Sequence, residues 1–562
     1  MTTFFQKGPE LRNQFDDDRA LNNYLKRVMP PEILKEITPG LKKLGQTAIE
    51  EVWTLGNQAE AQPPRHVPFD SWGRRIDHIE VSQAWKTLEK IAAEEQLISL
   101  AYERPNGIYS RIHQFTRVYL FSASSAVYIC PLAMTDGAAR AIELFGDDDL
   151  KKKIFKNLTS SDPQKFWTSG QWMTERTGGS DVATTTTVAK KEEAGFRLYG
   201  DKWFTSATTS QVAMTLARIE DQNGRSVEGG KGLSLFCLEL RNPDGSLKNI
   251  TINRLKDKLV TRALPTAELT LNGTPATLVG GEGDGIKKIS ALFNITRIWN
   301  SCAAVAFMRR GLALARSYAH QRVAFGKKLI DLPLHQQTLA ALEAEFQLCF
   351  HLCFRVAELL GKEELNQISK EESILLRVLT PLLKLYTAKE AIHSASEVLE
   401  CFGGAGYVED TGLPRLLRDS QVLSIWEGTT NVLSLDMLRA HKKEEALFVL
   451  FNEITRQLKT MTHPELQEQA ATLAGYRDGL HDFVTELQSD SLIQEYAARE
   501  VALKASRLYG TVLLGAQAQW ELNINKSTGQ NPVQVLHALN FSIKKLLNQP
   551  NLQIQELESL AR

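Results

Sequence analysis

One carboxylate stands out because of its neighbours. Glu427 lies in the stretch RDSQVLSIWEGTTNVLSL, residues 418–435, directly between Trp426 and Gly428. Ionising a carboxylate among apolar neighbours costs free energy, so such a group takes up a proton more readily than one in water. The stretch is therefore either an ordinary solvated turn or the position of a general base.

Four other short stretches suit a cofactor that has a flat ring and phosphates. TERTGGSDV (174–182) places a glycine pair among hydroxyls, and DKWFTSA (201–207) places a tryptophan beside hydroxyls. HQRVAFGKKL (320–329) offers an arginine, and ECFGGAGY (400–407) offers a second glycine pair. Each alone has an ordinary explanation: a turn, a buried tryptophan, a surface arginine or a helix C-cap. TERTGGSDV lies outside any βαβ unit, so it is not a Rossmann fingerprint.

The elements that must position these residues fall into blocks along the chain. Residues 1–165 show mainly helical apolar spacing, interrupted at 58–80 by a proline-containing stretch that we expect to be a long loop. Thr- and Val-rich alternation then predicts short strands, and helical spacing resumes near 286. This order predicts an α+β fold. The expected domains are 1–165, 166–285, 286–445 and an additional helical domain, 446–562.

Bulk composition narrows the possible partners. With 562 residues the chain is too long for one core, and its 43% apolar and 23% charged residues are typical of globular proteins. Lys+Arg and Asp+Glu both number 66, so net charge gives no reason to expect nucleic acid or an anionic membrane as partner. No apolar run approaches the roughly 20 residues that a membrane span needs.

The cysteines and the N-terminus bear on the cellular compartment. Six cysteines show no CxxC spacing, and CFHLC (349–353) fits buried thiols in a helix better than a metal site, so we expect no metal. This pattern favours a reducing compartment. The N-terminal segment has no secretory apolar core and carries acids early, which favours the cytoplasm, with the mitochondrial matrix as the alternative.

Taken together and in order, these stretches resemble one family. MTERTGGSD, KWFTS, QRVAFG, FGGAGY and RLLRDSQVLSIWEGTTN resemble the acyl-CoA dehydrogenase superfamily from about residue 70 to about residue 445. FDSWGRRIDHIEVSQAW, RLKDKLVTRA and the helical block after residue 446 are similar to its AidB-like branch. The resemblance implies an N-terminal helical domain, a central β-barrel, a C-terminal four-helix bundle and an extra C-terminal helical domain.

The resemblance also implies a reaction: FAD-dependent oxidation of a medium- to long-chain fatty acyl-CoA to the trans-2-enoyl-CoA. Glu427 would remove the α-proton, with Arg297 nearby, and flavin N5 would accept the hydride. The implied substrate-binding residues are Ser180, Asn294, Arg297 and Gly428. The implied FAD-binding residues are Gln171, Met173, Thr174, Gly179, Ser180, Trp203, Phe204, Thr205, Ser206, Arg322, Phe325, Gly403, Gly404, Trp426, Thr429 and Asn431.

Some of these residues would serve the neighbouring subunit. Arg322 and Phe325, with Gly403 and Gly404, would reach its FAD, so the resemblance implies a homodimer or homotetramer. An electron-transfer flavoprotein would accept the electrons. Three positions depart from the common family pattern: Asn294 stands where many members have Asp, and Pro333 and Glu400 stand where many have Gln. These departures affect the implied CoA and adenosine contacts.

Three alternatives remain open at this stage. The same pocket would suit an acyl-CoA- or fatty-acid-sequestering flavoprotein with little turnover, because fold and cofactor do not fix activity. An AidB-like DNA-associated flavoprotein needs a basic face, yet residues 441–562 contain more acidic than basic residues, which argues against nucleic acid. The third alternative is a helical scaffold that has lost its flavin.

Overall fold

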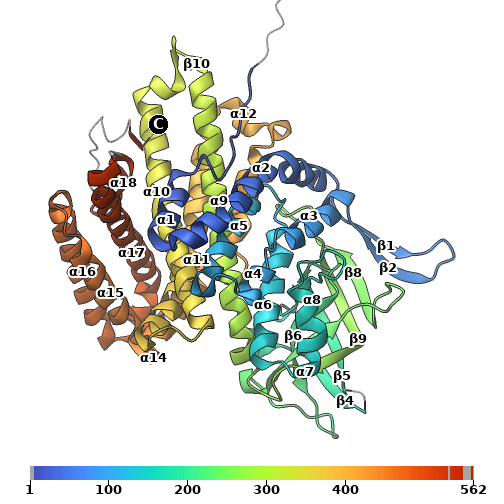
Figure 1. Cartoon of the computed structure of the whole chain (residues 1–562). Helices are drawn as coiled ribbons and strands as arrows, with labels where there is room; N and C mark the ends of the chain where they lie inside the picture. The colour runs from blue at the N-terminus through green and yellow to red at the C-terminus, as the bar shows by residue number, and fades with distance from the viewer. Residues whose placement is uncertain (1–5, 194, 529–531, 549–558, 561–562) are drawn as a thin grey trace, which may run out of the picture. The chain divides into compact units, whose positions relative to one another are not determined.

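The computed structural model describes residues 6–193, 195–528, 532–548 and 559–560 (Figure 1). Helices precede and follow a block of strands, which confirms the predicted α+β fold. The chain forms two compact units. The first comprises Met1–Ile49, Asn106–Ala123 and Asn300–Arg562, and the second comprises Glu50–Pro105 and Ser124–Trp299. Two long helices, α2 Pro31–Ala61 and α9 Gly285–Gln321, belong in part to each unit.

A seven-stranded sheet dominates the second unit. Its strand order is β3-β6-β4-β5-β9-β7, β8 pairs with β9, and a further β6–β7 pairing closes the sheet on itself. This closure confirms the predicted central β-barrel. β6 is buried along nearly its whole length because its alternate side chains enter two hydrophobic clusters, one on each face of the sheet. The strands are β3 Ser169–Gln171, β4 Val188–Glu192, β5 Gly195–Ser206, β6 Val212–Ile219, β7 Leu233–Glu239, β8 Ile250–Leu255 and β9 Thr266–Leu278.

Two hydrophobic clusters hold the second unit together. Trp172 and Phe236 belong to a cluster formed by side chains of the barrel strands. A second cluster joins Ala138 and Ile142 of α6 to Met214 of β6, so α6 packs against the barrel through its apolar face. The helices of this unit are α3 Gln83–Glu94, α4 Ser99–Glu103, α6 Ile129–Phe145, α7 Asp148–Leu150 and α8 Lys156–Leu158.

The loop expected at residues 58–80 was wrong. Helix α2 continues to Ala61, and β1 Arg65–Phe69 pairs with β2 Arg75–Glu80 as an antiparallel hairpin. The register shifts between Val67 and Phe69, so Pro68 sits at an irregularity where its missing N–H breaks no regular ladder. Proline therefore marked a bulge in a strand here rather than a loop.

Long helices make up the first unit. Helix α11 begins with a capping box, in which the Ser369 hydroxyl accepts from the Glu372 N–H and the Glu372 carboxylate accepts from the Ser369 N–H. Pro333 is the first residue of α10, where its missing N–H costs nothing. The elements are α1 Arg19–Val28, α5 Ser110–Ser122, β10 Val323–Ala324, β11 Lys327–Lys328, α10 Pro333–Glu364, α11 Lys370–Cys401, α12 Gly404–Tyr407, α13 Pro414–Leu423 and α14 Thr430–Glu444.

The C-terminal helices pack on this bundle within the same unit. Glu345 of α10 accepts hydrogen bonds from Arg507 at 3.1 Å, from Lys545 at 2.9 Å and from the Tyr386 hydroxyl at 2.5 Å. Because Glu345 is buried, these charge-assisted bonds join the added helices firmly to α10 and α11. The added helices are α15 Ala446–Thr460, α16 Gln467–Glu486, α17 Ser491–Thr528 and α18 Val533–Leu546.

Candidate active site

Glu427 lies in the tight turn between α13 and α14. It is half-buried and has φ +56°, and the following Gly428 has φ +101°. A left-handed conformation is strained for a residue with a side chain, at a cost on the order of 1 kcal/mol or more. The turn must therefore be stabilised by contacts outside itself.

Lys384 of α11 supplies that stabilisation. Its side chain is almost wholly buried, and its Nζ donates to the carbonyl oxygen of Trp426 at 2.7 Å and to that of Gly428 at 2.6 Å. The ammonium group thus binds the peptide carbonyls on both sides of Glu427. Sequence reasoning missed Lys384. The only signal was a single charge inside the apolar stretch TPLLKLYTA.

Trp426 is anchored from a second helix. Its indole Nε1 donates to Oδ1 of Asn300 on α9, which is also buried. Nδ2 of Asn300 is buried and has no hydrogen-bond partner among the described residues. An unsatisfied buried donor costs free energy, so this position is suited to a bound acceptor. Asn300 was not among the predicted site residues.

In the second unit, two of the predicted stretches come together. The N–H of Trp203 donates to the carbonyl of Thr174 at 2.9 Å. A Cβ at Gly179 would lie 2.9 Å from the Thr174 hydroxyl, so the close approach of the loop requires glycine. Two cations lie against the half-buried Trp203 ring, the Arg176 guanidinium at 5.1 Å and Lys256 Nζ at 3.6 Å from its centroid.

A buried ion pair fixes this loop to strand β5. Lys202 Nζ lies 2.8 Å from Glu175, and both side chains are almost completely buried. Glu175 also accepts from Thr186 and Thr187. Burial disfavours the ionised form of Glu175, but Lys202 and these hydrogen bonds outweigh it and lower its pKa to about 2. The carboxylate therefore stays ionised and holds the predicted flavin-binding loop in one conformation.

The hydroxyls predicted to meet the flavin differ in access. Thr205 is fully buried, and its hydroxyl donates to the carbonyl of Ala267 at 2.7 Å. Ser206 is half-buried and shares a hydrogen bond with Thr266. Of this pair, Ser206 is the more accessible to a bound molecule. The side chain of Met173 lies in the core between α6 and the barrel, so only its backbone is left to contact a cofactor.

The predicted contacts to a neighbouring subunit lie on an exposed hairpin. Arg322 follows α9, and Phe325 and Gly326 form the turn between β10 and β11 with φ +52° and +76°. Phe325 is 96% exposed. Gly403, which precedes α12, and Gly404, its first residue, are also exposed, and apart from their chain neighbours no atom lies within 4 Å of a Cβ built on either.

The remaining predicted residues occupy helix ends and one helix face. Thr429 is the N-cap of α14, and Asn431 accepts a hydrogen bond from Arg499 of α17 at 3.1 Å. Asn294 and Arg297 are half-buried and three residues apart on α9, so they share one helix face. Ser180 and Phe204 are exposed.

The described residues fit the flavin that the sequence implies. Oε1 of Gln171 is buried and has no hydrogen-bond partner among the described residues, so it can accept from a bound group. The open space at Gly403 and Gly404 admits a ligand close to the backbone. In the described part of the chain, no cluster of three or more His, Cys, Asp or Glu residues could hold a metal ion.

Comparison with known proteins identifies the class. Three family profiles match: "Adaptive response protein AidB N-terminal domain" over residues 8–163, "Acyl-CoA dehydrogenase, middle domain" over 170–274, and "Acyl-CoA dehydrogenase, C-terminal domain" over 283–441. The barrel between helical blocks and these matches together place the chain in the acyl-CoA dehydrogenase family. It is accordingly an FAD-dependent oxidoreductase.

Individual relatives narrow the position within that family. The chain is 43% identical over 528 residues to acyl-CoA dehydrogenase family member 11 of Caenorhabditis elegans, covering 91% of this chain and 85% of that protein. It is 31% identical to putative acyl-CoA dehydrogenase AidB of Escherichia coli (strain K12), covering 74% and 76% of the two chains. The AidB-like branch inferred from the sequence is therefore confirmed.

Comparison with solved structures supports the same family assignment. C. elegans ACDH-11 in complex with C11-CoA superposes with a TM-score of 0.93 at 40% identity, covering 99% of this chain and 95% of that one. Bd2924 in its apo form has a TM-score of 0.85 at 52% identity, covering 92% and 100%. No helix within the described ranges combines the length and apolar character that a bilayer crossing requires.

Proposed function

We propose that this protein oxidises a medium- to long-chain fatty acyl-CoA to the trans-2-enoyl-CoA, with Glu427 as the base that removes the α-proton. One observation carries the proposal: a half-buried carboxylate in a strained turn whose flanking carbonyls are both bound by a buried lysine. The C11-CoA complex of ACDH-11, 40% identical to this chain, supports the substrate class.

The Lys384 contacts also orient the backbone at Glu427. In a planar trans peptide the C=O and the following N–H point in opposite directions. Because the Trp426 carbonyl points toward Lys384, the Glu427 N–H points away from it. An N–H fixed in this way can donate to the thioester carbonyl oxygen and stabilise the negative charge that develops there as the α-proton leaves.

Other residues of the chain would act as the base or bind the flavin and the substrate. Glu427 takes the proton, and Arg297 on α9 offers positive charge toward the thioester end. Gln171, Thr174, Trp203 and Ser206 would hold the flavin ring, and Thr429 and Asn431 would lie near the diphosphate and adenosine. Gly403 and Gly404 would contact the FAD of a neighbouring subunit. When bound, FAD supplies a hydride acceptor at flavin N5. Ser180, Asn294 and Gly428 would contact the acyl-CoA.

The proposal also includes the oligomeric state of the protein and the acceptor of its electrons. An exposed aromatic at the tip of a hairpin, Phe325 with Arg322 at its base, supports FAD contacts to a neighbouring subunit in a homodimer or homotetramer. We propose an electron-transfer flavoprotein as the acceptor. All six cysteines are free and buried, which supports a reducing compartment, with the cytoplasm as first choice and the mitochondrial matrix as second.

Anaerobic titration with saturated acyl-CoAs of graded chain length, followed by flavin absorbance, tests the proposal. The expected result is bleaching of the oxidised flavin band, fastest for medium or long chains. Tight binding of these acyl-CoAs without bleaching would refute dehydrogenation and favour the sequestering role. Absence of both binding and bleaching would remove acyl-CoA as the ligand.

A further inference from the structure

The helical unit contains a cavity of about 340 Å³ that none of the candidate active-site residues lines. Its walls come from α1, the 3₁₀ turn Gly107–Tyr109, α10, α15 and α17. The charged side chains in the wall are three cations, Arg27, Arg355 and Lys362, and one anion, Glu358. The cavity wall therefore has an excess of positive charge.

The excess is concentrated on Arg27. Arg355 lies 2.6 Å from Glu358, and Lys362 lies 2.9 Å from Glu372, so both have carboxylate partners. Arg27 instead donates through Nε to the neutral amide of Gln517 at 2.6 Å and lies over the Tyr24 ring. No ion pair joins Arg27 to any carboxylate among the described residues.

Arg27 is half-buried, and a guanidinium group that is partly removed from water without a directly paired carboxylate is costly. Burial lowers the pKa of Arg27, which reports the same penalty. A bound anion would remove it. Arginine is also the side chain that best matches the oxygen pairs of carboxylates and phosphates, because its planar fork donates two parallel hydrogen bonds.

His351 gives a second, independent indication. Its side chain lines the same cavity and is 2% exposed, yet Nδ1 has no hydrogen-bond partner among the described residues. Burial and the nearby Arg27 lower its pKa well below the usual range, so the ring is neutral and carries one N–H. The buried Nε of Arg355, one turn further along α10, also has no partner in the described chain. Unsatisfied polar groups of this kind are rare in protein interiors, and in the tautomer that carries its proton on Nδ1 the His351 ring can donate into the cavity.

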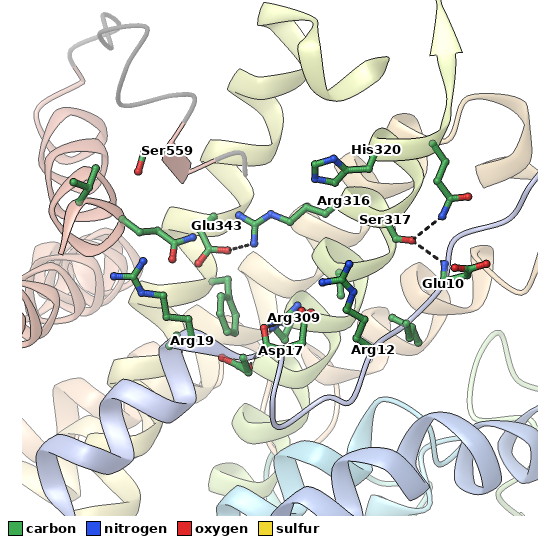
Figure 2. A pocket seen from close by; sticks show the side chains of 18 residues that line it. Glu10, Arg12, Asp17, Arg19, Arg309, Arg316, Ser317, His320, Glu343 and Ser559 are labelled. Carbon is green, nitrogen blue, oxygen red and sulfur yellow. Dashed lines mark hydrogen bonds and ion pairs between the residues drawn. The ribbon is translucent and has the colours of Figure 1, made fainter. Parts of the chain in front are cut away.

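A larger cavity of the same unit, lined by Arg309 and Arg316, provides the contrast (Figure 2). Its volume is about 890 Å³, and two arginines in its wall already form ion pairs with carboxylates. Arg309 pairs with Asp17 and Asp18, each at 3.2 Å, and Arg316 pairs with Glu343 at 2.9 Å. Although this cavity is larger, both of these arginines already have carboxylate partners in the described chain.

We propose that the smaller cavity, lined by Arg27 and His351, is a binding site for a small anion carrying a carboxylate or phosphate group. The anion would accept from the Arg27 guanidinium and from the His351 N–H, with the Tyr109 side chain also in the wall. At roughly 30 Å³ for each water-sized group, the space suits a ligand of about ten non-hydrogen atoms or fewer. Because α15 and α17 contribute Gln457 and Leu513 to the wall, a bound anion would stabilise the packing of the added helices.

Isothermal titration of the FAD-loaded full-length protein with inorganic phosphate and, separately, with malonate tests the site. We expect one of the two anions to bind, and Arg27→Gln to weaken that binding roughly 10- to 100-fold, as expected for loss of charge-assisted hydrogen bonds. Arg225→Gln, which removes an exposed arginine of the other unit, is the matched control and should leave binding unchanged. Equal affinity in wild type and Arg27→Gln, or no binding of either anion at millimolar concentration, would overturn the proposal.

A crystallographic experiment does not depend on the stability of the variant. Wild-type crystals soaked in selenate, a tetrahedral oxyanion of the same shape as phosphate that scatters anomalously, should show a selenium peak close to Arg27. His351→Phe should weaken the calorimetric signal without affecting flavin content. Selenate peaks confined to other arginines, with none in this cavity, would contradict the assignment.

Discussion

Lys384→Met gives the sharpest test of how the turn at Glu427 is stabilised. The substitution keeps the apolar stem but removes two hydrogen bonds, of 2.7 and 2.6 Å, to the carbonyl oxygens of Trp426 and Gly428. A hydrogen bond to a charged group contributes roughly 1.5–3 kcal/mol, and removing the donor leaves both acceptors unsatisfied. The turn also contains the strained Glu427, at φ +56°, whose conformation would lose its anchor.

We therefore expect the native turn to be disfavoured by about 3 kcal/mol relative to relaxed conformations. At 1.36 kcal/mol for each factor of ten, the rate of flavin bleaching by a saturating acyl-CoA should fall roughly 100-fold. Acyl-CoA affinity should change only a few-fold, because most of the ligand lies away from the turn. This split between rate and affinity is what a positioning role predicts.

The assay is anaerobic stopped-flow absorbance of FAD-loaded protein, with flavin content and far-UV circular dichroism as checks on folding. Lys389→Met removes another lysine of the same helix that is not bonded to the turn and serves as the matched control. A Lys384→Met variant that binds FAD and bleaches at the wild-type rate would refute the reasoning. So would an equal loss of rate in the control.

Three further predictions follow from other contacts. The pKa of Glu175 is lowered to about 2, so its pairing with Lys202 stabilises the fold above about pH 4.5, and this is lost as pH falls toward 2. Glu175→Gln should lower the free energy of unfolding by up to about 3 kcal/mol at pH 7 and should reduce its decrease between pH 4.5 and pH 2, both measured by urea unfolding. An unchanged decrease between these pH values would contradict the prediction. Burial and the nearby Glu345 raise the pKa of Glu390 to about 7. The stability that the protonated Glu390 side chain contributes is therefore fully present below pH 4.5 and is lost as pH rises through 7. Glu390→Gln should then stabilise the protein at pH 8 by up to about 3 kcal/mol and have little effect at pH 4.5, whereas equal effects at both pH values would contradict this. Gly428→Ala should destabilise by about 1–3 kcal/mol in thermal unfolding, because φ is +101° and the new Cβ would lie 3.1 Å from Leu433, and a neutral effect would show that the turn adapts.

Much of the fold could be predicted from the sequence because its signals are local. The change from helical to alternating spacing located the barrel, and the helical spacing after residue 446 located the added helices. The hairpin at β1 and β2 was missed because Pro68 is typical of loops, and only the partner strand shows that it sits at a register irregularity. Strand pairing between distant segments is not a local property.

The candidate site likewise has features that could be predicted from the sequence and features that could not. The pairing of Thr174 with Trp203 agrees with the proximity that the motif order implied, and Glu427 lies in a turn as expected. Lys384 was missed because a buried lysine and a solvated lysine look alike in sequence, and burial is decided by how helices pack. The difference in access between Thr205 and Ser206 likewise depends on tertiary structure, because successive side chains of β5 point to opposite faces of the sheet and the two faces are covered differently.

The most direct test of the central claim compares wild type with Glu427→Gln in a single anaerobic turnover. Both FAD-loaded proteins are mixed with a saturating medium-chain acyl-CoA, and the oxidised flavin band is followed. Loss of the base should slow bleaching by roughly 10²- to 10⁴-fold while acyl-CoA still binds. If Glu427→Gln bleaches as fast as wild type, Glu427 is not the base and the proposed mechanism is wrong.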